Sequence, residues 1–375
     1  MNLHLIPQVI RHELVAPHEV HLGAMASGGL SGAWIWQGQS PHGPVALRAW
    51  PTVHPTPERL SQIHAAMRTA RQLGLEIIPR IFGNRQGDSY VSDGQRLWEL
   101  TQWMPGAADY HSAPSAQRLQ AAMRSLAELH LAWYRAAAGD ASTAWSNCSA
   151  AVASVVGPVS GASPTVAERR QKLEFSLQQQ SAWQRCVFAS GADCAARQTD
   201  SLVNVFGPNF SEPTAAALSS LAQQTLLHLA ALGPGLLRHL IEVQATPVRL
   251  QFVLRDVWSD HILFSEDRVS GIIDFGAARV DEPATDVARL LGSLEPLDAS
   301  RWLLGWQAYH AGNPHIELVR VQLLDRVGTL LAAVQWLQWL VIQPRQFDAP
   351  LPQLLERWRR LVVRLENGNF GCFTH

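Results

Sequence analysis

The sequence predicts an α+β fold of two lobes, in which a small antiparallel-sheet lobe precedes a large, mainly helical lobe. Three observations support this prediction. The chain has 375 residues, which is more than one hydrophobic core usually serves. Its first hundred residues contain short apolar runs separated by Gly, Pro, Asp and Asn, as in sheets with hairpins. After Met104 long stretches have helical periodicity, so we expect lobes at residues 1–103 and 104–375.

Five apolar runs in the small lobe have the length and composition of strands, and they cover residues 33–37, 45–50, 77–82, 89–92 and 96–103. One helix interrupts them. Thr56 is its predicted N-cap, Pro57 suits the first helical position, and Gly74 ends the segment.

The large lobe contains several apolar segments with helical spacing, predicted at residues 117–135, 301–311, 316–342 and 351–366. Residues 165–168 have the spacing of a capping box, which predicts the start of a further helix. Residues 213–244 predict two helices, separated at Gly233-Pro234-Gly235 because proline disrupts a helix interior.

Composition indicates a folded chain and argues against two classes of partner. Hydrophobic residues make up 47% and charged residues 16%, a balance that favours a packed core over disorder. The net charge is -1 and no basic run occurs, so we expect no nucleic-acid partner. The longest apolar stretch is interrupted by Gln335 and Gln338, so we expect no membrane span. Four cysteines without metal-binding spacing and an N-terminus without an apolar signal segment predict a cytoplasmic protein.

Two aspartates flank a predicted hairpin in the large lobe. Residues 254–261 form a loop that contains Asp256, and Asp274 follows the second strand of the hairpin. Because both ends of a hairpin lie at one edge, we expect the two carboxylates to converge. Phosphoryl transfer needs such a pair, one to accept the proton of the attacking hydroxyl and one to bind the metal on the phosphates. Aspartate is also common in turns, which leaves a structural interpretation open.

Residues 274–289, with the sequence DFGAARVDEPATDVAR, resemble the aminoglycoside phosphotransferase and choline kinase-like family. In that family a D-F-G is followed at this distance by an acidic-Pro-Ala-x-Asp-x-Ala stretch. Further motifs follow in the family's order, namely the glycine-rich loop at 25–32, the phosphate-binding strand at 45–48, the inter-lobe hinge at 99–106 and the LAELH helix pattern at 126–130. The resemblance covers residues 23–293 and implies a bilobal protein kinase-like fold.

The resemblance implies a kinase that transfers phosphate from ATP, or another NTP, to a hydroxyl group of a small molecule, with Mg²⁺ or Mn²⁺. It implies Asp256, in the catalytic loop 254–261, as the catalytic base, and Asp274 of the D-F-G segment 274–276 as a metal ligand. The implied nucleotide-binding residues come from the glycine-rich loop and the third strand: Gly28, Gly29, Ser31, Gly32 and Arg48. The acceptor and the oligomeric state are not predicted. Eight arginines against five carboxylates between Arg301 and Glu366 disfavour a polycationic aminoglycoside.

The catalytic loop departs from the family's His-Gly-Asp-x-His-x-x-Asn, because only the aspartate is kept. Trp258 replaces the second histidine, and His261 replaces the asparagine that binds metal. We expect His261 in the metal site, where an imidazole would favour manganese over magnesium. The alternative is that His261 only hydrogen-bonds the backbone of the Asp256 loop.

The third strand carries Arg48 where the family has lysine, and arginine is not a neutral exchange for lysine. Glu58, the only carboxylate on the following helix, lies away from its apolar stripe, so an Arg48–Glu58 ion pair is not expected. His64 lies nearer that stripe and is expected in the core. These departures leave two alternatives to an active kinase, a nucleotide-binding pseudokinase and an interaction module.

Overall fold

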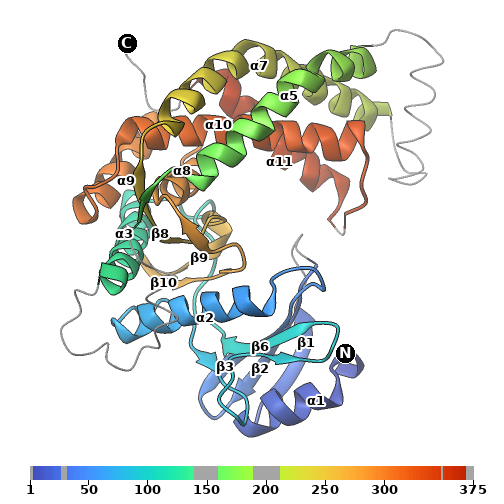
Figure 1. The fold of residues 1–375 in the computed structure, drawn as a ribbon. Helices are drawn as coiled ribbons and strands as arrows, with labels where there is room; N and C mark the ends of the chain where they lie inside the picture. Colours follow the sequence, from blue (N-terminus) through green and yellow to red (C-terminus); the bar gives the residue numbers. More distant parts are fainter. Residues whose placement is uncertain (1–2, 27–31, 139–158, 189–211, 348, 369–375) are drawn as a thin grey trace. The chain divides into compact units, whose positions relative to one another are not determined.

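The computed structural model describes residues 3–26, 32–138, 159–188, 212–347 and 349–368. These residues form two compact units, drawn in Figure 1. The first unit comprises residues 1–159, 249–294 and 304–315, and the second comprises 160–248, 295–303 and 316–375. The N-terminal sheet, the loop 254–261 and the D-F-G segment 274–276 thus belong to one unit. A lobe boundary after residue 103 stays a prediction.

A six-stranded sheet dominates the N-terminal part of the first unit. Its strands are β1 (His21–Ala26), β2 (Trp34–Ser40), β3 (Gly43–Ala49), β4 (Ile81–Phe82), β5 (Val91–Ser92) and β6 (Leu97–Gln102). They run in the order β1-β2-β3-β6-β4, with β5 also paired to β6, and all the pairs are antiparallel. Strand β4 is shorter than predicted, because the chain turns at Leu75–Ile78 and Pro79 has no N–H to donate to a neighbouring strand.

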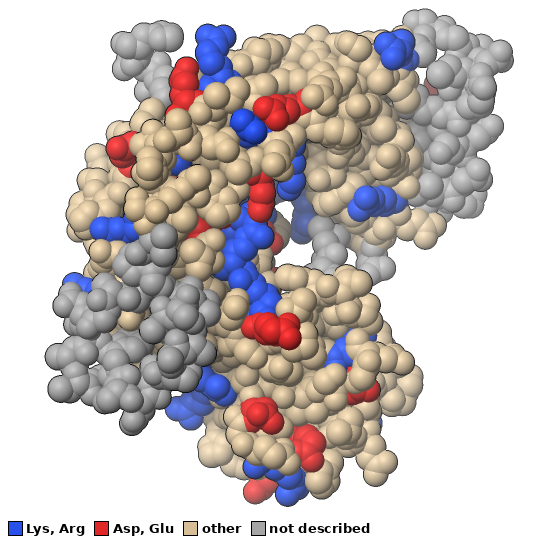
Figure 2. All heavy atoms as spheres, viewed as in Figure 1, with Lys and Arg blue, Asp and Glu red and all other residues tan. Residues whose placement is uncertain are grey.

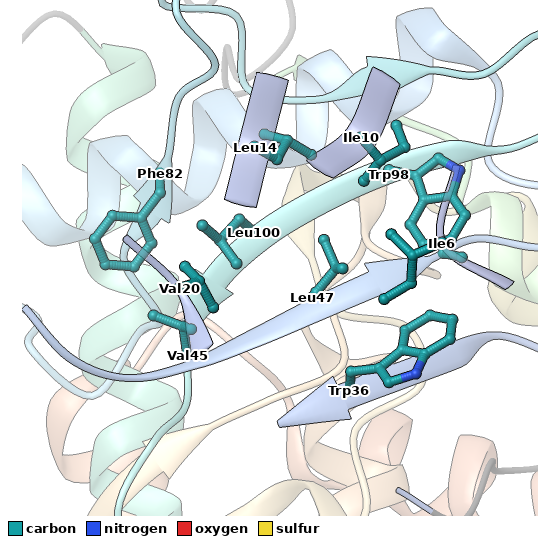
Figure 3. Close-up of a cluster of buried hydrophobic side chains, with 11 residues drawn as sticks. Ile6, Ile10, Leu14, Val20, Trp36, Val45, Leu47, Phe82, Trp98 and Leu100 are labelled. Carbon is teal, nitrogen blue, oxygen red and sulfur yellow. The ribbon is translucent and has the colours of Figure 1, made fainter. Parts of the chain in front are cut away.

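One face of this sheet is covered by the N-terminal helical turns η1 (Leu3–Leu5), α1 (Gln8–Ile10), η2 (Arg11–Val15) and η3 (Ala16–His18). Figure 3 shows the core beneath them, where Ile10 and Leu14 meet Leu47 and Leu100. Because side chains alternate along a strand, residues 48 and 99 lie on the opposite face.

Helix α2 (Pro57–Gln72) lies along the sheet (Figure 1) and begins as the sequence predicts. The Thr56 hydroxyl accepts a hydrogen bond from the Arg59 N–H at 3.3 Å, and Pro57 occupies the first helical position. Gly74, which follows the helix, has a φ of +89°, a backbone conformation that residues other than glycine rarely adopt. Leu60 packs with Trp50 and Leu97, so α2 covers the face of the sheet that carries residues 48 and 99.

The segment with the two aspartates folds as a hairpin of β9 (Ile262–Ser265) and β10 (Arg268–Ile272), preceded by the short turn η4 (Ser259–His261). Its neighbours are α3 (Ala116–Ala138), β8 (Val248–Val253), β11 (Arg279–Asp281), which pairs with β8, and α8 (Ala284–Leu294). The predicted hinge lies against this hairpin, since Ala107 and Phe264 exchange two backbone hydrogen bonds of 2.9 and 3.0 Å. Gly106 is required there, because a Cβ would lie 2.5 Å from the Phe264 carbonyl oxygen.

The second unit is helical. It contains α5 (Pro164–Phe188), α7 (Glu212–Gln244), α10 (Leu318–Leu337) with its extension η5 (Gln338–Ile342), and α11 (Leu351–Asn367). Strand β7 (Val159–Gly161) and helix α9 (Ala299–Gly312) fall where the chain passes from one unit to the other. Ser163, rather than Thr165, caps α5, because its hydroxyl accepts the Val166 N–H at 3.2 Å.

Helix α7 continues through Pro234, so the predicted break at residues 233–235 is wrong. A proline inside a helix costs about 3 kcal/mol, but buried leucines continue on both sides of it, from Leu229 to Leu236 and Leu240. Gly233 lies where α5 approaches, since a Cβ there would be 2.8 Å from a methyl carbon of Leu177. Packing against α5 therefore outweighs the local disruption. Within the described ranges, α7 is the one helix long and apolar enough to cross a membrane, a property that core helices can share.

A buried ion pair joins α10 to α11. Asp325 and Arg364 are in contact, with side chains only 3% and 5% exposed, and Trp302 donates its indole N–H to Asp325 at 3.2 Å. Burial raises the pKa of Asp325 above its usual range, although Arg364 offsets part of that effect.

We expect Arg364→Met to lower the free energy of unfolding at neutral pH by about 3–5 kcal/mol, because it leaves a buried carboxylate unpaired. A raised folded-state pKa means that stability is lost as pH rises through it, so the loss should shrink at mildly acidic pH, where Asp325 binds a proton. Denaturant unfolding at both pH values checks this. The control is Arg360→Met, whose ion pair with Glu356 is exposed and should contribute less than about 1 kcal/mol. Equal losses in the two variants would contradict the prediction.

Candidate active site

Arg48 pairs with an acid on the neighbouring strand, not on the following helix. Glu99 of β6 lies directly opposite Arg48 of β3, and its Oε1 is 3.6 Å from the Arg48 Nε. Its Oε2 accepts a hydrogen bond from the Nε2 of His64 on α2 at 2.7 Å. Glu58 is exposed, as its place on the helix predicts. Arg48, Glu99 and His64 thus link two strands and the helix, with the carboxylate on the sheet and the histidine on the helix.

The Glu99 carboxylate is ionised although it is only 5% exposed. Burial raises the pKa of Glu99. The hydrogen bond from His64 and the electrostatic effects of His64 and Arg48 together lower it by a larger amount, so the net shift is downward. A buried charge of this kind is stable only with its partners in place. Glu99 therefore holds the Arg48 side chain in position.

Asp274 of the D-F-G segment reaches the same place. Its Oδ1 lies 3.5 Å from the Arg48 Nη1, and its side chain is 40% exposed. Its φ is +61°, a left-handed conformation that is uncommon outside glycine and concentrated at functional sites. Gly276 allows close packing beneath it, because a Cβ there would lie 2.9 Å from the Trp50 ring.

His261 lies between the two aspartates. Its Nδ1 is 2.7 Å from the backbone oxygen of Asp256, and its Nε2 is 2.8 Å from the indole nitrogen of Trp258 and 3.6 Å from the Asp274 Oδ2. A carbonyl only accepts and an indole N–H only donates, so the proton of the neutral ring is on Nδ1 and the Nε2 lone pair is used by Trp258. The structure thus contains the backbone hydrogen bond of our alternative. Metal binding by His261 would require the bond from Trp258 to open.

A buried carboxylate positions the loop that carries Asp256. Asp286, on α8, accepts hydrogen bonds from the backbone N–H groups of Leu254 and Arg255, both at 2.6 Å. Arg255 has a φ of +66°, which turns two successive N–H groups toward one carboxylate. Asp286 also accepts the Nε2–H of His130 at 3.1 Å, so α3 and α8 both hold the loop.

The network behind Asp286 extends to α9. The Nδ1 of His130 accepts the hydroxyl proton of Tyr309 at 2.7 Å, and that hydroxyl accepts the side-chain N–H of Asn313 at 3.2 Å. Burial and the charge of Asp286 raise the pKa of Tyr309 well above 10, so its hydroxyl stays protonated and can donate. Asp286 and His130 were not predicted as functional residues. The signal available was their place in the motifs at residues 126–130 and 274–289, and the structure shows that both are fully buried.

The carboxylate of Asp256 is in contact with the guanidinium of Arg289 on α8. Both side chains are nearly half exposed, at 45% and 43%. The structure therefore brings Arg48, Asp274 and His261 together, with Asp256 joined to them through its backbone. Its carboxylate is directed to an arginine that our sequence analysis did not single out.

Of the predicted glycine-rich loop, Gly28, Gly29 and Ser31 lie outside the described residues. The loop connects the antiparallel strands β1 and β2, in which Ala26 is paired with Ile35. Gly32 is exposed and has a φ of +71°, and a Cβ at this position would meet no described atom within 4 Å. The positive φ at Gly32 is one that glycine adopts readily.

A metal at this site would rely on few protein ligands. In the parts of the chain that the structure describes, no group of three or more His, Cys, Asp or Glu side chains could hold an ion. Asp274 offers one partly exposed carboxylate. Magnesium commonly binds through one or two carboxylates, water and substrate phosphates, so Asp274 suits an ion that is bound mainly by a nucleotide.

We expect Glu99→Gln to destabilise the protein by about 1–3 kcal/mol, because Arg48 and His64 lose a buried charged partner. The lowered pKa of Glu99 gives stability that is present above the ordinary glutamate value of 4.5 and is lost as pH falls toward the folded-state value. The difference between wild type and variant should therefore shrink in acid. Thermal and denaturant unfolding from neutral to acidic pH measure it. Glu58→Gln on the exposed face of α2 is the control, and a Glu99→Gln variant no less stable than this control would contradict the assignment.

The sequence and the fold are similar to those of known proteins. Residues 26–320 match the model of the phosphotransferase enzyme family. A search of curated proteins finds no match. An aminoglycoside phosphotransferase from Alicyclobacillus acidocaldarius is structurally similar, with a TM-score of 0.55 and 15% identity over 96% of this chain and 93% of the other. Spectinomycin phosphotransferase, solved with ADP and spectinomycin, has a TM-score of 0.57 and 10% identity over 96% of each chain.

An amicoumacin kinase solved with AMP-PNP and Ca²⁺ has a TM-score of 0.51 and 13% identity, over 92% of this chain and 88% of the other. These likenesses confirm the α+β kinase-like fold. The family match covers most of the residues, including Arg48, Glu99, the loop 254–261 and Asp274. The chain therefore belongs to the phosphotransferase enzyme family.

Proposed function

We propose that this protein transfers the terminal phosphate of ATP, or of another NTP, to a hydroxyl group of a small molecule. One observation carries the proposal. Arg48, held by Glu99 and His64, lies 3.5 Å from Asp274, and His261 joins Asp274 to the loop of Asp256. A cation for phosphate, a carboxylate for metal and a carboxylate for a proton are thus supplied by adjoining elements.

In this proposal Arg48 and the loop of residues 28–32 bind the nucleotide phosphates. A guanidinium can grip phosphate oxygens in a bidentate manner, so arginine can serve where the family has lysine. Asp274 holds Mg²⁺ or Mn²⁺, which when bound neutralises charge on the phosphates. Asp256 accepts the proton of the acceptor hydroxyl, and Asp286 fixes the backbone that carries it. The predicted cytoplasmic location remains part of the proposal.

Comparing Asp256→Asn with Asp274→Asn tests these roles. Both amides are nearly isosteric with the acids, so folding should persist. We expect Asp256→Asn to reduce phosphate transfer by about 100-fold or more with nucleotide affinity kept, as for loss of a general base. Asp274→Asn should lower both the transfer rate and metal-dependent nucleotide affinity. Turnover assays and calorimetry with ATP and Mg²⁺ measure these effects.

The matched control is Asp260→Asn, an exposed carboxylate on the same loop, which should behave as wild type. Nucleotide binding without turnover on any hydroxyl compound, and without Asp256-dependent hydrolysis of ATP, would identify a pseudokinase instead. No nucleotide binding with any divalent metal would reject the nucleotide site and favour an interaction module.

The hydrogen bond from Trp258 to His261 gives a sharper test of the metal site. Trp258→Phe removes the indole N–H and frees the Nε2 lone pair of His261. If His261 can bind the metal, nucleotide affinity should shift toward manganese over magnesium by on the order of tenfold. Adding His261→Asn should abolish the shift. Calorimetry with magnesium, manganese and cobalt measures the ranking, and an unchanged ranking in all variants would remove His261 from the metal site.

A further inference from the structure

Helix α8 is almost completely buried, and Arg289 is its exception. Nine of its eleven residues are buried and Ser293 is partly buried, whereas Arg289 is exposed. The helix thus presents one long cationic side chain to solvent, and this side chain contacts the Asp256 carboxylate. Nothing in the proposed transfer step requires a cation at this position.

The contact with Arg289 competes with the proposed role of Asp256. A carboxylate oxygen that is bound to a guanidinium is less available to a hydroxyl that must donate its proton. The ion pair is exposed on both sides, at 43% and 45%, so it contributes little to stability and can exchange for another partner. The pair between Arg364 and Asp325 in the second unit differs, because it is nearly excluded from solvent. Arg289 is therefore a cation that can move from Asp256 to an incoming anion.

We propose that Arg289 binds an acidic group of the acceptor, and that the acceptor is a compact hydroxy acid, with its hydroxyl on Asp256 and its carboxylate or phosphate on Arg289. This inference rests on the proposed kinase function and specifies its substrate class. The planar guanidinium fork matches both acidic groups. An acceptor with an amine at this position would meet a like charge.

Two neighbouring arginines, unlike Arg289, are paired with acids that the proposed reaction does not use as the base. Arg255, next to Asp256, contacts the buried Asp281, and Arg48 is held by Glu99 and Asp274. Among the described residues, Arg289 pairs with Asp256, and in the proposed reaction this contact must open so that Asp256 can accept a proton. On the face seen in Figure 2, acidic side chains are scattered among uncharged ones, without a broad acidic area that would attract a polycation.

The transfer step balances without a further reactant. The acceptor hydroxyl gives its proton to Asp256, and its oxygen forms a bond to the terminal phosphorus of the nucleotide. The bond from that phosphorus to the bridging oxygen breaks, and its electron pair leaves with the nucleoside diphosphate. The acid group on Arg289 keeps its charge throughout, so Arg289 positions the acceptor and takes no part in bond making.

The test uses three-carbon hydroxy compounds that carry an acid, no charge or an amine, namely glycerate, glycerol 3-phosphate, glycerol and 2-aminopropane-1,3-diol. Phosphate transfer from ATP is measured for the full chain, and binding is measured by calorimetry with a non-hydrolysable ATP analogue. We expect kcat/KM to favour one or both acids over glycerol by about tenfold or more, and the amine to be poorest. Which acid is preferred separates a carboxylate from a phosphate.

Arg289→Gln should remove the preference for acids, and Arg289→Glu should shift it toward the amine. Arg124→Gln, an exposed arginine of α3, is the control and should keep the wild-type ranking. Because Arg289 is exposed, unchanged melting temperatures are expected for its variants.

Equal use of all probes, a wild-type preference for the amine, or an acid preference that survives Arg289→Gln would each overturn the inference. Acid-selective binding that depends on Arg289, without transfer and without Asp256-dependent hydrolysis of ATP, would support the anion site and overturn the kinase proposal. Neither selective binding nor transfer with these probes would overturn the inference, and the kinase proposal would then be judged by its own test, the Asp256-dependent hydrolysis of ATP.

Discussion

The candidate active site depends on one buried carboxylate. Asp286 has no exposed surface, so its charge is tolerable only when its oxygens are bound. Two backbone N–H groups of the loop and the imidazole of His130 meet this requirement. The loop in turn depends on Asp286, because a change in the loop conformation would leave the buried carboxylate without these hydrogen bonds. The left-handed backbone at Arg255, which alone would be unfavourable, is maintained in this way.

A second buried carboxylate, Glu99, positions Arg48 in the N-terminal sheet. The helix that follows Arg48 in the sequence carries one carboxylate, Glu58, and this side chain is exposed. The acid instead stands directly across from Arg48 on β6, and α2 contributes His64 to it. The position of α2 is therefore coupled to Arg48 through His64 and Glu99, as it would be by a direct ion pair between Arg48 and the helix.

Each charged group of the candidate site already has a counter-group within the protein. Glu99 is bound by His64 and Arg48, Asp274 lies near Arg48 and His261, and Asp256 contacts Arg289. These contacts differ in how far their side chains are buried. Glu99 and His64 are enclosed and structural, whereas the pair at Asp256 is open to solvent and exchangeable. Substrates of a transferase must replace the exchangeable contacts, and for this reason the pair at Asp256 carries information about the acceptor.

The sequence by itself determined the elements whose signals are local. The cap and end of α2, the hairpin from Ile262 to Ile272 and the D-F-G segment with its following helix were all predictable from residues close together in the chain. The convergence of the Asp256 and Asp274 segments follows from hairpin geometry. These predictions need only propensity, periodicity and spacing. The kinase-like fold was predicted in a different way, from the resemblance of several motifs in a fixed order to a known family.

Only the tertiary structure decided which distant residues pair. The partners Arg48 and Glu99 are about fifty positions apart and Leu254 and Asp286 about thirty, and strand register or helix packing brings them together. The continuity of α7 through Pro234 was decided in the same way, by packing against α5. A local pattern states what a segment prefers, whereas burial of a charge or a methyl group depends on what the rest of the chain places beside it.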